Sequence, residues 1–442
     1  MNRLDLLDAL LDAAKRAGAD EADALMGSGT SLSVGRRLGK VEEIERAESD
    51  TVGLRVFVGS RSAIVSSGAI DPAGFSRLAE QAVAMARVVP EDRFSTIPDA
   101  PPPPDSAPLD MDDPAEPGVE ALLARAAAAE EAALAVKGIT NSEGAGASWS
   151  RSHIALATSR GFAGAYSRSS HGVSVSPIAG EGVGMQRDYE YSAAVHGADL
   201  ADPAGLGRAA AERAVSRLDP RRPATAKLPV VYHPRVAGSL LGHFAGAING
   251  ASIARGTSFL KDSMGQAIFA PGIAIIDDPL RRRGLRSRSF DGEGQTVSRR
   301  ALIEDGRLTT WLLDSRSAAQ LGLATTGHAA RGTSGPPSPA PSNLYMQPGA
   351  LSPEALIADI GLGLYVIELI GMGVNGITGD YSRGAAGFMI RDGQLAEPVA
   401  EVTVAGNLRE MFLHLTPAND LEFRRGTDAP TLRIEGMTMA GA

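Results

Sequence analysis

Apolar and polar residues alternate at helical spacing near the start of the chain. Across residues 4–14, leucine and alanine recur every three or four positions, and aspartates stand between them. This spacing predicts an amphipathic helix, and the interrupting aspartates are unlike the continuous apolar core of a signal peptide. A second helix is predicted over residues 71–89, where Pro72 follows the candidate cap Asp71 and apolar residues again keep helical spacing.

Alternation with a period of two fills the interval between these helices. The alternating runs cover residues 31–38, 41–48, 52–58 and 63–67, with Gly35, Gly39, Gly53, Gly59 and Gly68 as punctuation. Short alternating runs separated by glycine are typical of an antiparallel meander. We therefore expect a first α+β segment over residues 1–89.

The amino-acid composition changes after residue 89. Residues 90–117 include four consecutive prolines and few large apolar side chains, which predicts a stiff linker or surface strap. Helical patterns over 118–136 and 203–218 then enclose several strand-like runs. Residues 118–222 are therefore expected to form a second α+β segment.

The second half of the chain has another pattern. A helix is predicted to open at Pro234, and another lies over residues 353–362, but short strands and Gly- or Asp-bearing turns dominate. The fold class that follows is α+β, with two N-terminal segments and a β-rich C-terminal domain over residues 223–442.

The amino-acid composition excludes several kinds of site and partner. The chain has no cysteine, which excludes disulfides, thiolate metal ligands and cysteine nucleophiles. A net charge of −9 argues against direct binding to nucleic acid, which needs a basic face. The longest apolar stretch, residues 362–373, is too short and Gly-rich to span a membrane. We expect a cytoplasmic protein without direct nucleic-acid or membrane partners.

One local exception to the acidic character is the segment from Arg281 to Arg288, which holds five arginines. Such a cluster can meet phosphate or an acidic partner, but a solvated loop gives the same pattern. The sequence leaves both interpretations open.

The histidines do not form a metal-binding motif. A hydrolytic zinc site most economically uses two histidines one helical turn apart with a glutamate beside them. No two of the seven histidines lie three to five residues apart. His243 lies in a helix-like run, but Ser239 and Ala247, its neighbours one turn away, are not strong zinc ligands. A structural role for His243 is the simpler interpretation.

Other catalytic patterns are equally incomplete. Carboxylates that could bind a hard cation or act as an acid and base pair, although turns explain them as well, are Asp277, Asp278, Asp291, Glu293 and Asp314. The GxGxxG match over residues 371–376 lacks the following helix that a dinucleotide site needs. Ser258 and Lys261 have the spacing of an SxxK motif without its companion motifs.

Several segments of the C-terminal half carry a resemblance. In order along the chain they are GTSFLKDSMGQAI, IIDDPL, RSFDGEGQTVSRRALIEDG, TTGHAARG, PSNLYMQPG, GMGVNGITGDYSRGAAGFMIRDGQ and IEGMTMAG. With GLRVFVG near the start, these segments resemble the PmbA branch, also called TldE, of the TldD/PmbA family. The resemblance covers almost the whole chain and implies a barrel-like C-terminal domain.

The resemblance also implies a division of labour. TldD-type subunits carry a HExxxH zinc motif on the helix that opens the last domain, and a cysteine ligand further on. In this chain the first ligand position holds Gly242, the glutamate position holds His243, and the second ligand position holds Ala247. The resemblance therefore implies no metal in this chain, with zinc in a TldD-type partner that cleaves unfolded or small peptides.

Two functional hypotheses follow, from different classes. The first is a non-metal-binding subunit of a zinc metallopeptidase, with Asn375, Asp380, Tyr381 and Ser382 in a peptide cleft. The second is a non-catalytic peptide-binding or regulatory homodimer, in keeping with the name "modulator of DNA gyrase" that the family also carries. A hydrolase that works unaided through Asp or Lys is a third, weaker interpretation.

Overall fold

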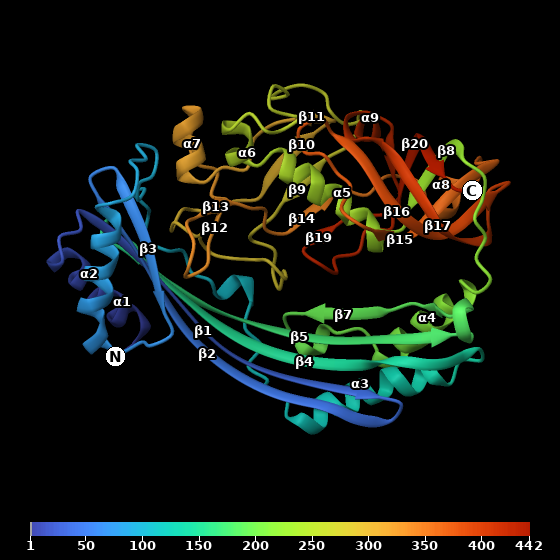
Figure 1. The fold of residues 1–442 in the computed structure, drawn as a ribbon, viewed down its shortest axis with the longest axis horizontal. Helices are drawn as coiled ribbons and strands as arrows, with labels where there is room; N and C mark the ends of the chain where they lie inside the picture. The colour runs from blue at the N-terminus through green and yellow to red at the C-terminus, as the bar shows by residue number, and fades with distance from the viewer. Residues whose placement is uncertain (1) are drawn as a thin grey trace.

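The computed structural model describes residues 2–442. Figure 1 shows two β-rich bodies facing each other, with the N-terminal one in blue and green and the C-terminal one in yellow to red. No helix among the described residues is long and apolar enough to cross a membrane.

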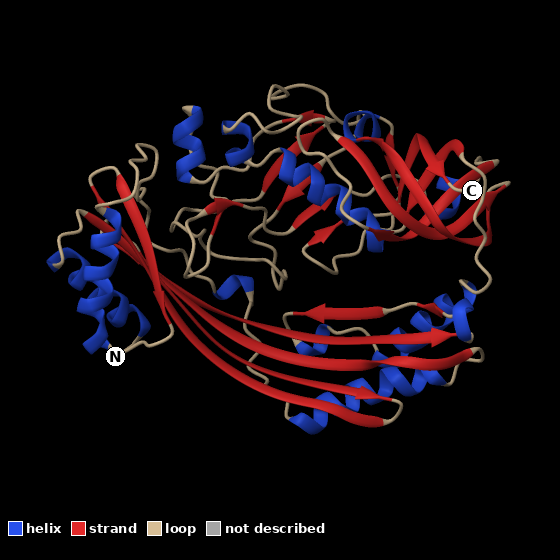
Figure 2. Ribbon diagram, viewed as in Figure 1, coloured by secondary structure: helices blue, strands red, loops and turns tan. Residues whose placement is uncertain are grey.

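The N-terminal body is a curved sheet with helices packed at both ends (Figure 2). Its helices are α1 (Arg3–Arg16), α2 (Phe75–Ala86), α3 (Val119–Leu134) and α4 (Pro203–Ser216), and its strands are β1 (Glu21–Arg37), β2 (Lys40–Val58), β3 (Arg61–Ser67), β4 (Ile139–Thr158), β5 (Ala163–Ala179), β6 (Gln186–Arg187) and β7 (Glu190–Ala194). The strand order is β3-β2-β1-β4-β5-β6, with β7 also paired to β5.

The first helix forms as its sequence pattern predicts. The Asn2 side chain accepts a hydrogen bond from the Asp5 amide, and the Asp5 carboxylate accepts one from the Asn2 amide, which completes a capping box. Leu7 and Leu10 are fully buried in the core where α1 packs against α2, β1 and β4. Local capping and tertiary burial therefore specify the same helix.

The two N-terminal segments share one sheet, which the sequence did not indicate. Strand β1 pairs with β2 on one edge and with β4 on the other along most of its length. The predicted runs 41–48 and 52–58 are parts of the single strand β2, so the prediction of a break at Gly53 was wrong. Glycine is required at position 53 of the strand because a Cβ there would overlap the backbone carbonyl of Thr333, which packs against it.

The C-terminal body contains a closed barrel and a second sheet. Its helices are α5 (Pro234–Ala247), α6 (Gly250–Ala254), α7 (Ser315–Leu321), α8 (Pro353–Ile357) and α9 (Leu408–Leu413), and its strands are β8 (Ala226–Tyr232), β9 (Ile275–Asp277), β10 (Arg300–Glu304), β11 (Arg307–Leu308), β12 (Ala329–Ala330), β13 (Ser338–Pro339), β14 (Leu344–Met346), β15 (Leu362–Ile370), β16 (Asp380–Arg391), β17 (Gln394–Asn407), β18 (Leu415–Pro417), β19 (Thr427–Asp428) and β20 (Leu432–Ala440).

The barrel is formed by five strands in the order β17-β16-β15-β8-β20, and pairing between β17 and β20 closes it. Helix α5 follows β8 and packs on the apolar core of this body through Leu240, Leu241 and Phe244. The predicted α+β class with a barrel-like C-terminal domain is confirmed.

The proline-rich stretch is a strap that contacts both bodies. Ile97 and Leu109 are buried, and the Met111 carbonyl accepts a hydrogen bond from the Ser169 amide on β5. Asp110 pairs with Arg282 and Arg283 of the C-terminal body, with the Asp110 carboxylate 2.6 Å from each guanidinium.

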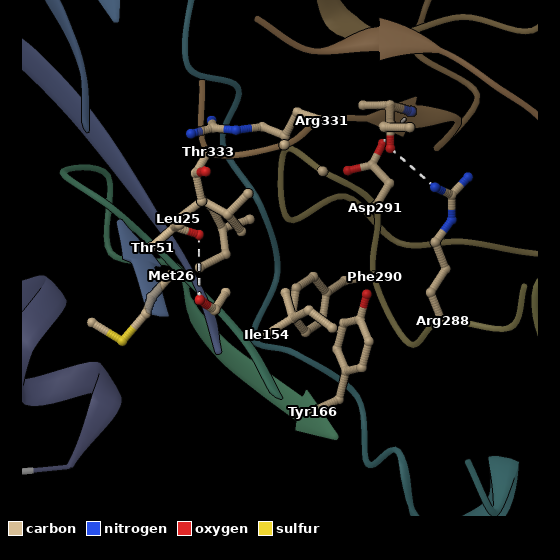
Figure 3. Close-up of a pocket in the computed structure, with 16 residues that line it drawn as sticks. Leu25, Met26, Thr51, Ile154, Tyr166, Arg288, Phe290, Asp291, Arg331 and Thr333 are labelled. Carbon is tan, nitrogen blue, oxygen red and sulfur yellow. Dashed lines mark hydrogen bonds between the residues drawn. The ribbon is translucent and has the colours of Figure 1, made fainter. Parts of the chain in front are cut away.

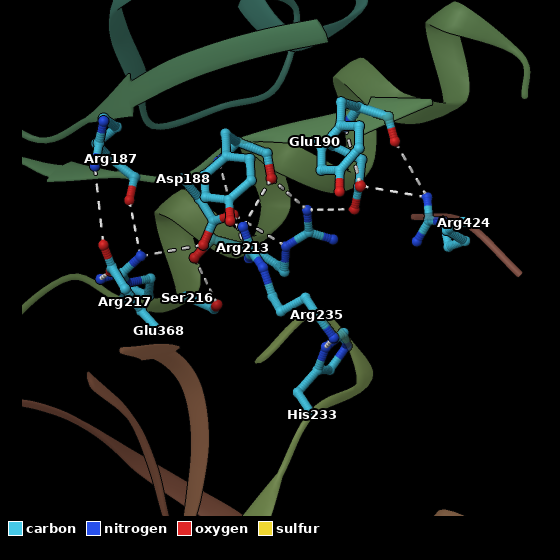
Figure 4. A network of polar contacts seen from close by, with 12 residues as sticks. Arg187, Asp188, Glu190, Arg213, Ser216, Arg217, His233, Arg235, Glu368 and Arg424 are labelled. Carbon is cyan, nitrogen blue, oxygen red and sulfur yellow. Dashed lines mark hydrogen bonds and ion pairs between the residues drawn. The ribbon is translucent and has the colours of Figure 1, made fainter. Parts of the chain in front are cut away.

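A buried ionic cluster joins the two bodies (Figure 4). The Asp188 side chain, between β6 and β7, is fully buried and lies 2.7 Å from Arg235 on α5. It lies 3.2 Å each from Arg213 on α4 and from Arg217, the residue that follows α4. Arg217 also pairs with Glu368 on β15. Burial raises the pKa of Asp188, but the three arginines outweigh it and hold the pKa below its usual value. The cluster fixes the start of α5 relative to the N-terminal sheet.

Candidate functional site

Helix α5 carries Gly242, His243 and Ala247, the positions at which the resemblance leads us to expect a zinc motif. Pro234 occupies its first turn, and the His233 side chain caps it by accepting a hydrogen bond from the Arg235 amide at 3.1 Å. Gly242 and Gly246 lie on the exposed face, and a Cβ at either position would meet no atom within 4 Å. Ala247 is buried. One face of the helix is therefore an open surface without side chains.

His243 borders this open surface and is half-buried. Its ring lies edge-on to Tyr381 of β16, with 6.0 Å between the ring centroids. The Nε2 atom is buried and has no hydrogen-bond partner within residues 2–442. Burial, assisted by the nearby charge of Arg383, lowers the pKa of His243. His243 is therefore held as a neutral ring at neutral pH.

These residues do not fit a zinc ion. Gly242 and Ala247 offer no ligand atom, and His243 alone cannot complete a tetrahedral site. The described part of the chain contains no group of three or more His, Cys, Asp or Glu side chains that could hold a metal. The positive charge of Arg383 beside His243 would also repel a cation.

Two of the predicted cleft residues shape the loop between β15 and β16. The Asn375 side chain accepts hydrogen bonds from the amides of Ile377 and Thr378, which is an Asx-type turn. Asp380 accepts from the Thr378 hydroxyl at 2.6 Å and from Asn407 at 3.1 Å, and both bonds lower its pKa. Both side chains are exposed, and part of their hydrogen-bonding capacity is used within the loop.

The other two predicted residues point in opposite directions. Successive side chains of a strand alternate between its faces, and Tyr381 turns inward while Ser382 stays exposed. Tyr381 is only 1% exposed; burial raises the pKa of its hydroxyl, and hydrogen bonding to Tyr232 and Arg383 opposes that rise. The structure therefore brings Asn375 and Asp380 together, leaves Ser382 nearby at the surface, and brings Tyr381 to His243.

Arg383 is the residue that the sequence interpretation missed. It follows Tyr381 by two positions on β16 and therefore lies on the same face of the strand. Its charge acts on His243, Tyr381 and Tyr232. The period-two alternation of a strand could have identified it, had Tyr381 been recognised as inward-facing.

The candidate acid and base residues serve as caps and turns. Asp314 caps α7 through the Ser317 amide, and Asp291 accepts hydrogen bonds from the amides of Glu293, Gln295 and Ala329. Asp277 accepts from Ser342 and lies 3.2 Å from His328. These bonds explain the carboxylates by local structure, in favour of the turn interpretation.

Glu293 differs from its neighbours because its pKa is raised to about 7, by burial first and by the nearby Asp291 second. It accepts a hydrogen bond from the Ser315 amide at 2.9 Å. The group lies close to the contact between the two bodies, where Asp23 pairs with both Arg55 and Arg331.

A cavity of about 370 Å³ lies next to that contact (Figure 3). Leu25 and Ile154 of the N-terminal sheet form one wall, and Phe290 and Arg331 of the C-terminal body form the other. The ring of Phe290 packs edge-on against Tyr166, with 5.3 Å between centroids. The cavity is mainly apolar and lies between the bodies.

The arginine cluster is largely paired within the chain. Arg283 pairs with Asp110 and Asp199, and Arg281 stacks over the Phe423 ring at 3.3 Å from its centroid. Arg288 donates to the carbonyls of Ala329 and Ala340. These contacts favour a structural role over recruitment of a separate anion.

Comparison with protein families matches three consecutive domain models along the chain. They are described as PmbA/TldA metallopeptidase domain 1 over residues 22–86, the central domain over 112–218, and the C-terminal domain over 225–441.

Curated relatives align over nearly the whole length. Metalloprotease PmbA of Escherichia coli O157:H7 is 38% identical over 426 residues, which cover 96% of this chain and 93% of the relative. A metalloprotease PmbA homolog of Haemophilus influenzae is 32% identical and covers 98% of this chain and 94% of the relative.

Solved structures share the fold. A Bacteroides thetaiotaomicron protein described as a proposed modulator of DNA gyrase has a TM-score of 0.90 at 25% identity, covering 99% of this chain and 98% of its own. TldE from Thermococcus kodakarensis has a TM-score of 0.86 at 18% identity, covering 99% of this chain and 100% of its own. At that lower identity the likeness concerns the fold alone.

Proposed function

The chain belongs to the PmbA/TldD metallopeptidase family, on its PmbA (TldE) branch, and we propose that it is the metal-free subunit of a heteromeric zinc peptidase. In this assembly a TldD-type partner holds the zinc and cleaves unfolded or small peptides. This chain contributes to substrate binding and to assembly.

The main support for the proposal is the set of residues that α5 contains. The helix is intact, capped and packed on the barrel core, yet Gly242 and Ala247 stand where metal ligands are expected. A chain that had lost its function would not be expected to keep the whole surrounding scaffold folded. Retention of the scaffold without ligands supports a division of labour between two subunits.

Substrate contact is proposed for the loop between β15 and β16. Asn375, Asp380 and Ser382 are exposed there, whereas Tyr381 lies beneath them. A peptide cannot extend the barrel by pairing with β16. Strand β17 occupies one of its edges, and β15 together with loop residues 373–375 occupies the other. We therefore propose that this loop contacts peptides through its side chains and tip.

A reconstitution assay tests the proposed function. The purified chain is mixed with a TldD-type subunit from the same source, and peptide cleavage is measured with and without a chelator. Cleavage is expected from the mixture, with loss on chelation, and no cleavage from this chain alone. Cleavage by the chain alone would refute the assignment, and a mixture no more active than the partner alone would favour the regulatory homodimer.

Substitution of the loop separates substrate binding from assembly. Asn375→Ala with Asp380→Ala is expected to raise the KM of the reconstituted pair several-fold while the two subunits still co-purify. Glu181→Ala, at an exposed turn position with an extended backbone and no side-chain cap hydrogen bond, is the control. Unchanged cleavage by the double variant would remove the loop from the proposed cleft.

A further inference from the structure

The cavity between the two bodies has a buried apolar end and an exposed end (Figure 3). At the buried end, Leu156 is 1% exposed and Phe290 is 3% exposed. At the other end, the lining residues Thr51 of β2 and Gly332 of the C-terminal body are both exposed. The cavity is therefore a pocket with a mouth at the surface, at the junction of the two bodies.

The charged groups that line this pocket are already engaged by the protein itself. Asp291 accepts hydrogen bonds from three backbone amides, and Arg288 donates to two backbone carbonyls. Arg331 pairs with Asp23. The rest of the lining consists mainly of aliphatic and aromatic side chains and of glycine and alanine. A ligand in this pocket is therefore bound chiefly through the burial of apolar surface.

The volume and the wall of the pocket suit an aromatic ring. Its volume of about 370 Å³ is more than twice the roughly 150 Å³ of an apolar cavity that holds benzene. The Phe290 ring packs edge-on against Tyr166 and against Phe162, with 5.3 and 5.1 Å between the ring centroids. Aromatic rings favour such edge and offset contacts with one another. An aromatic side chain therefore matches the pocket in both size and chemistry.

The mouth opens on the face of the N-terminal sheet that is turned toward the C-terminal body. Thr51 and Gly27, both of which line the pocket, are paired across β2 and β1. Residues two positions apart on a strand share a face, so the next row on this face is also defined by the register. That row consists of Ser49, Gly29 and Ser152. These small residues leave room for an extended backbone to lie against the sheet beside the mouth.

We propose that the pocket between the two bodies receives an aromatic side chain of a peptide whose backbone lies along this face of the sheet. This inference rests on the proposed function, because the peptide is a substrate of the assembly. Unfolded chains expose aromatic side chains that folded proteins largely bury. Such a pocket therefore favours unfolded peptides without taking part in the chemistry of cleavage.

Fluorine NMR on the full-length chain tests the proposal with capped, uncharged peptides. The probe is acetyl-alanyl-(4-fluorophenylalanyl)-alanine amide, and the competitors carry phenylalanine, leucine or alanine at the central position. The phenylalanine peptide is expected to displace the probe at a concentration at least about tenfold lower than the alanine peptide, as burial of a large apolar side chain requires. Equal displacement by the leucine peptide would remove the aromatic preference and overturn the proposal.

Variants connect probe binding to the pocket. Thr51→Trp places a large ring over the mouth, and Ala330→Phe fills the pocket from the C-terminal body, so both are expected to abolish probe binding. Ile44→Trp is the matched control, because Ile44 is 52% exposed on the opposite face of β2, and it keeps probe binding. Thermal unfolding establishes that each variant is folded. Probe binding that survives either pocket substitution in a folded variant, or that is absent in the wild type, would contradict the proposal.

Toluene, which is the phenylalanine side chain without a backbone, distinguishes a peptide from a free aromatic compound. It is expected to displace the probe several-fold less well than the phenylalanine peptide, and equal displacement would overturn the proposal.

Cleavage by the chain reconstituted with a TldD-type partner separates this inference from the proposed function. If the pair cleaves peptides but the chain shows no preference for the phenylalanine peptide, the pocket fails and the proposed function stands. If the chain shows the preference but the pair does not cleave, the proposed function fails and the pocket stands as a peptide-binding site.

Discussion

Asp188 shows how one residue can hold two bodies together. Its carboxylate is fully buried and faces Arg213, Arg217 and Arg235, which come from the N-terminal body and from α5. Removing one member of a buried ionic cluster leaves the opposite charges buried and unpaired. This usually lowers stability more than replacing the whole cluster by apolar residues does.

We predict that Asp188→Asn lowers stability by roughly 3 kcal/mol or more, measured by thermal or denaturant unfolding. Asp359→Asn, an exposed carboxylate beside Arg433, is the control and should change little. The pKa of Asp188 is lowered in the folded state, so its contribution is complete above the unfolded value of 3.8 and is lost as pH falls through the folded pKa. A variant as stable as the wild type at pH 7 would contradict this account.

The pH dependence expected from Glu293 is opposite to that expected from Asp188. Its pKa is about 7 in the fold against 4.5 for the free side chain, so the folded state binds more protons between these values and stability falls as pH rises through them. Glu293→Gln keeps the acceptor for the Ser315 amide and removes the buried charge. We expect the variant to gain up to about 3 kcal/mol relative to the wild type at pH 8 and little at pH 4.

Unfolding midpoints of wild type and Glu293→Gln across this pH range measure the effect. A difference between the two proteins that is the same at pH 4 and pH 8 would show that Glu293 does not titrate in this window.

At the scale of elements, the sequence predicts most helices and the class of the fold. Capping residues and periodicity locate α1, α2, α3 and α4 to within a few residues. The predicted helix over 353–362 is shorter, because α8 ends at Ile357 and β15 already starts at Leu362. Helices with local signals are therefore predictable, whereas their ends depend on the neighbouring elements.

Sheet pairing is the part that the sequence could not supply. Gly53 looked like a turn residue, but it is needed for the approach of Thr333 from a segment far away in the sequence. The inward-facing Tyr381 likewise meets a residue far away in the sequence, His243 on α5, so the candidate cleft was only partly predictable. Arg383 could be assigned to the same face of the strand as Tyr381 only once the register of β16 was known.

We predict that Gly53→Ala destabilises the contact between the two bodies. The added methyl group would overlap the Thr333 carbonyl, so either β2 or the loop must move. The expected cost is about 1–3 kcal/mol, seen as a lower unfolding temperature and faster proteolysis near Thr333. Gly361→Ala, where a Cβ meets nothing within 4 Å, is the control. An unchanged unfolding temperature for Gly53→Ala would argue against tight docking there.

Strand β2 leaves part of one edge of the N-terminal sheet unpaired. Strand β3 covers β2 only along residues 52–58, so residues 40–51 present a free edge with exposed side chains. Five carboxylates, Glu42, Glu43, Glu45, Glu48 and Asp50, lie along it. Charges on an edge strand oppose unwanted pairing with the edges of other chains.

The whole molecule has the three-domain organisation of the PmbA/TldD metallopeptidase family, with Gly242 and Ala247 on an intact α5. The two bodies are joined by the Asp188 cluster, by the contact of Asp23 with Arg55 and Arg331, and by the proline-rich strap. These joints fix α5 and the loop between β15 and β16 relative to the N-terminal sheet. Such rigidity suits a subunit that presents a surface to a partner and to a peptide.

Zinc analysis of the assembled and separated subunits shows which polypeptide binds the metal. The chain is purified alone and in complex with a TldD-type subunit, and the zinc bound to each polypeptide is measured by elemental mass spectrometry after separation. The account predicts stoichiometric zinc on the partner and zinc near background on this chain in both preparations. Stoichiometric zinc on this chain, lost in a His243→Gln variant, would contradict it.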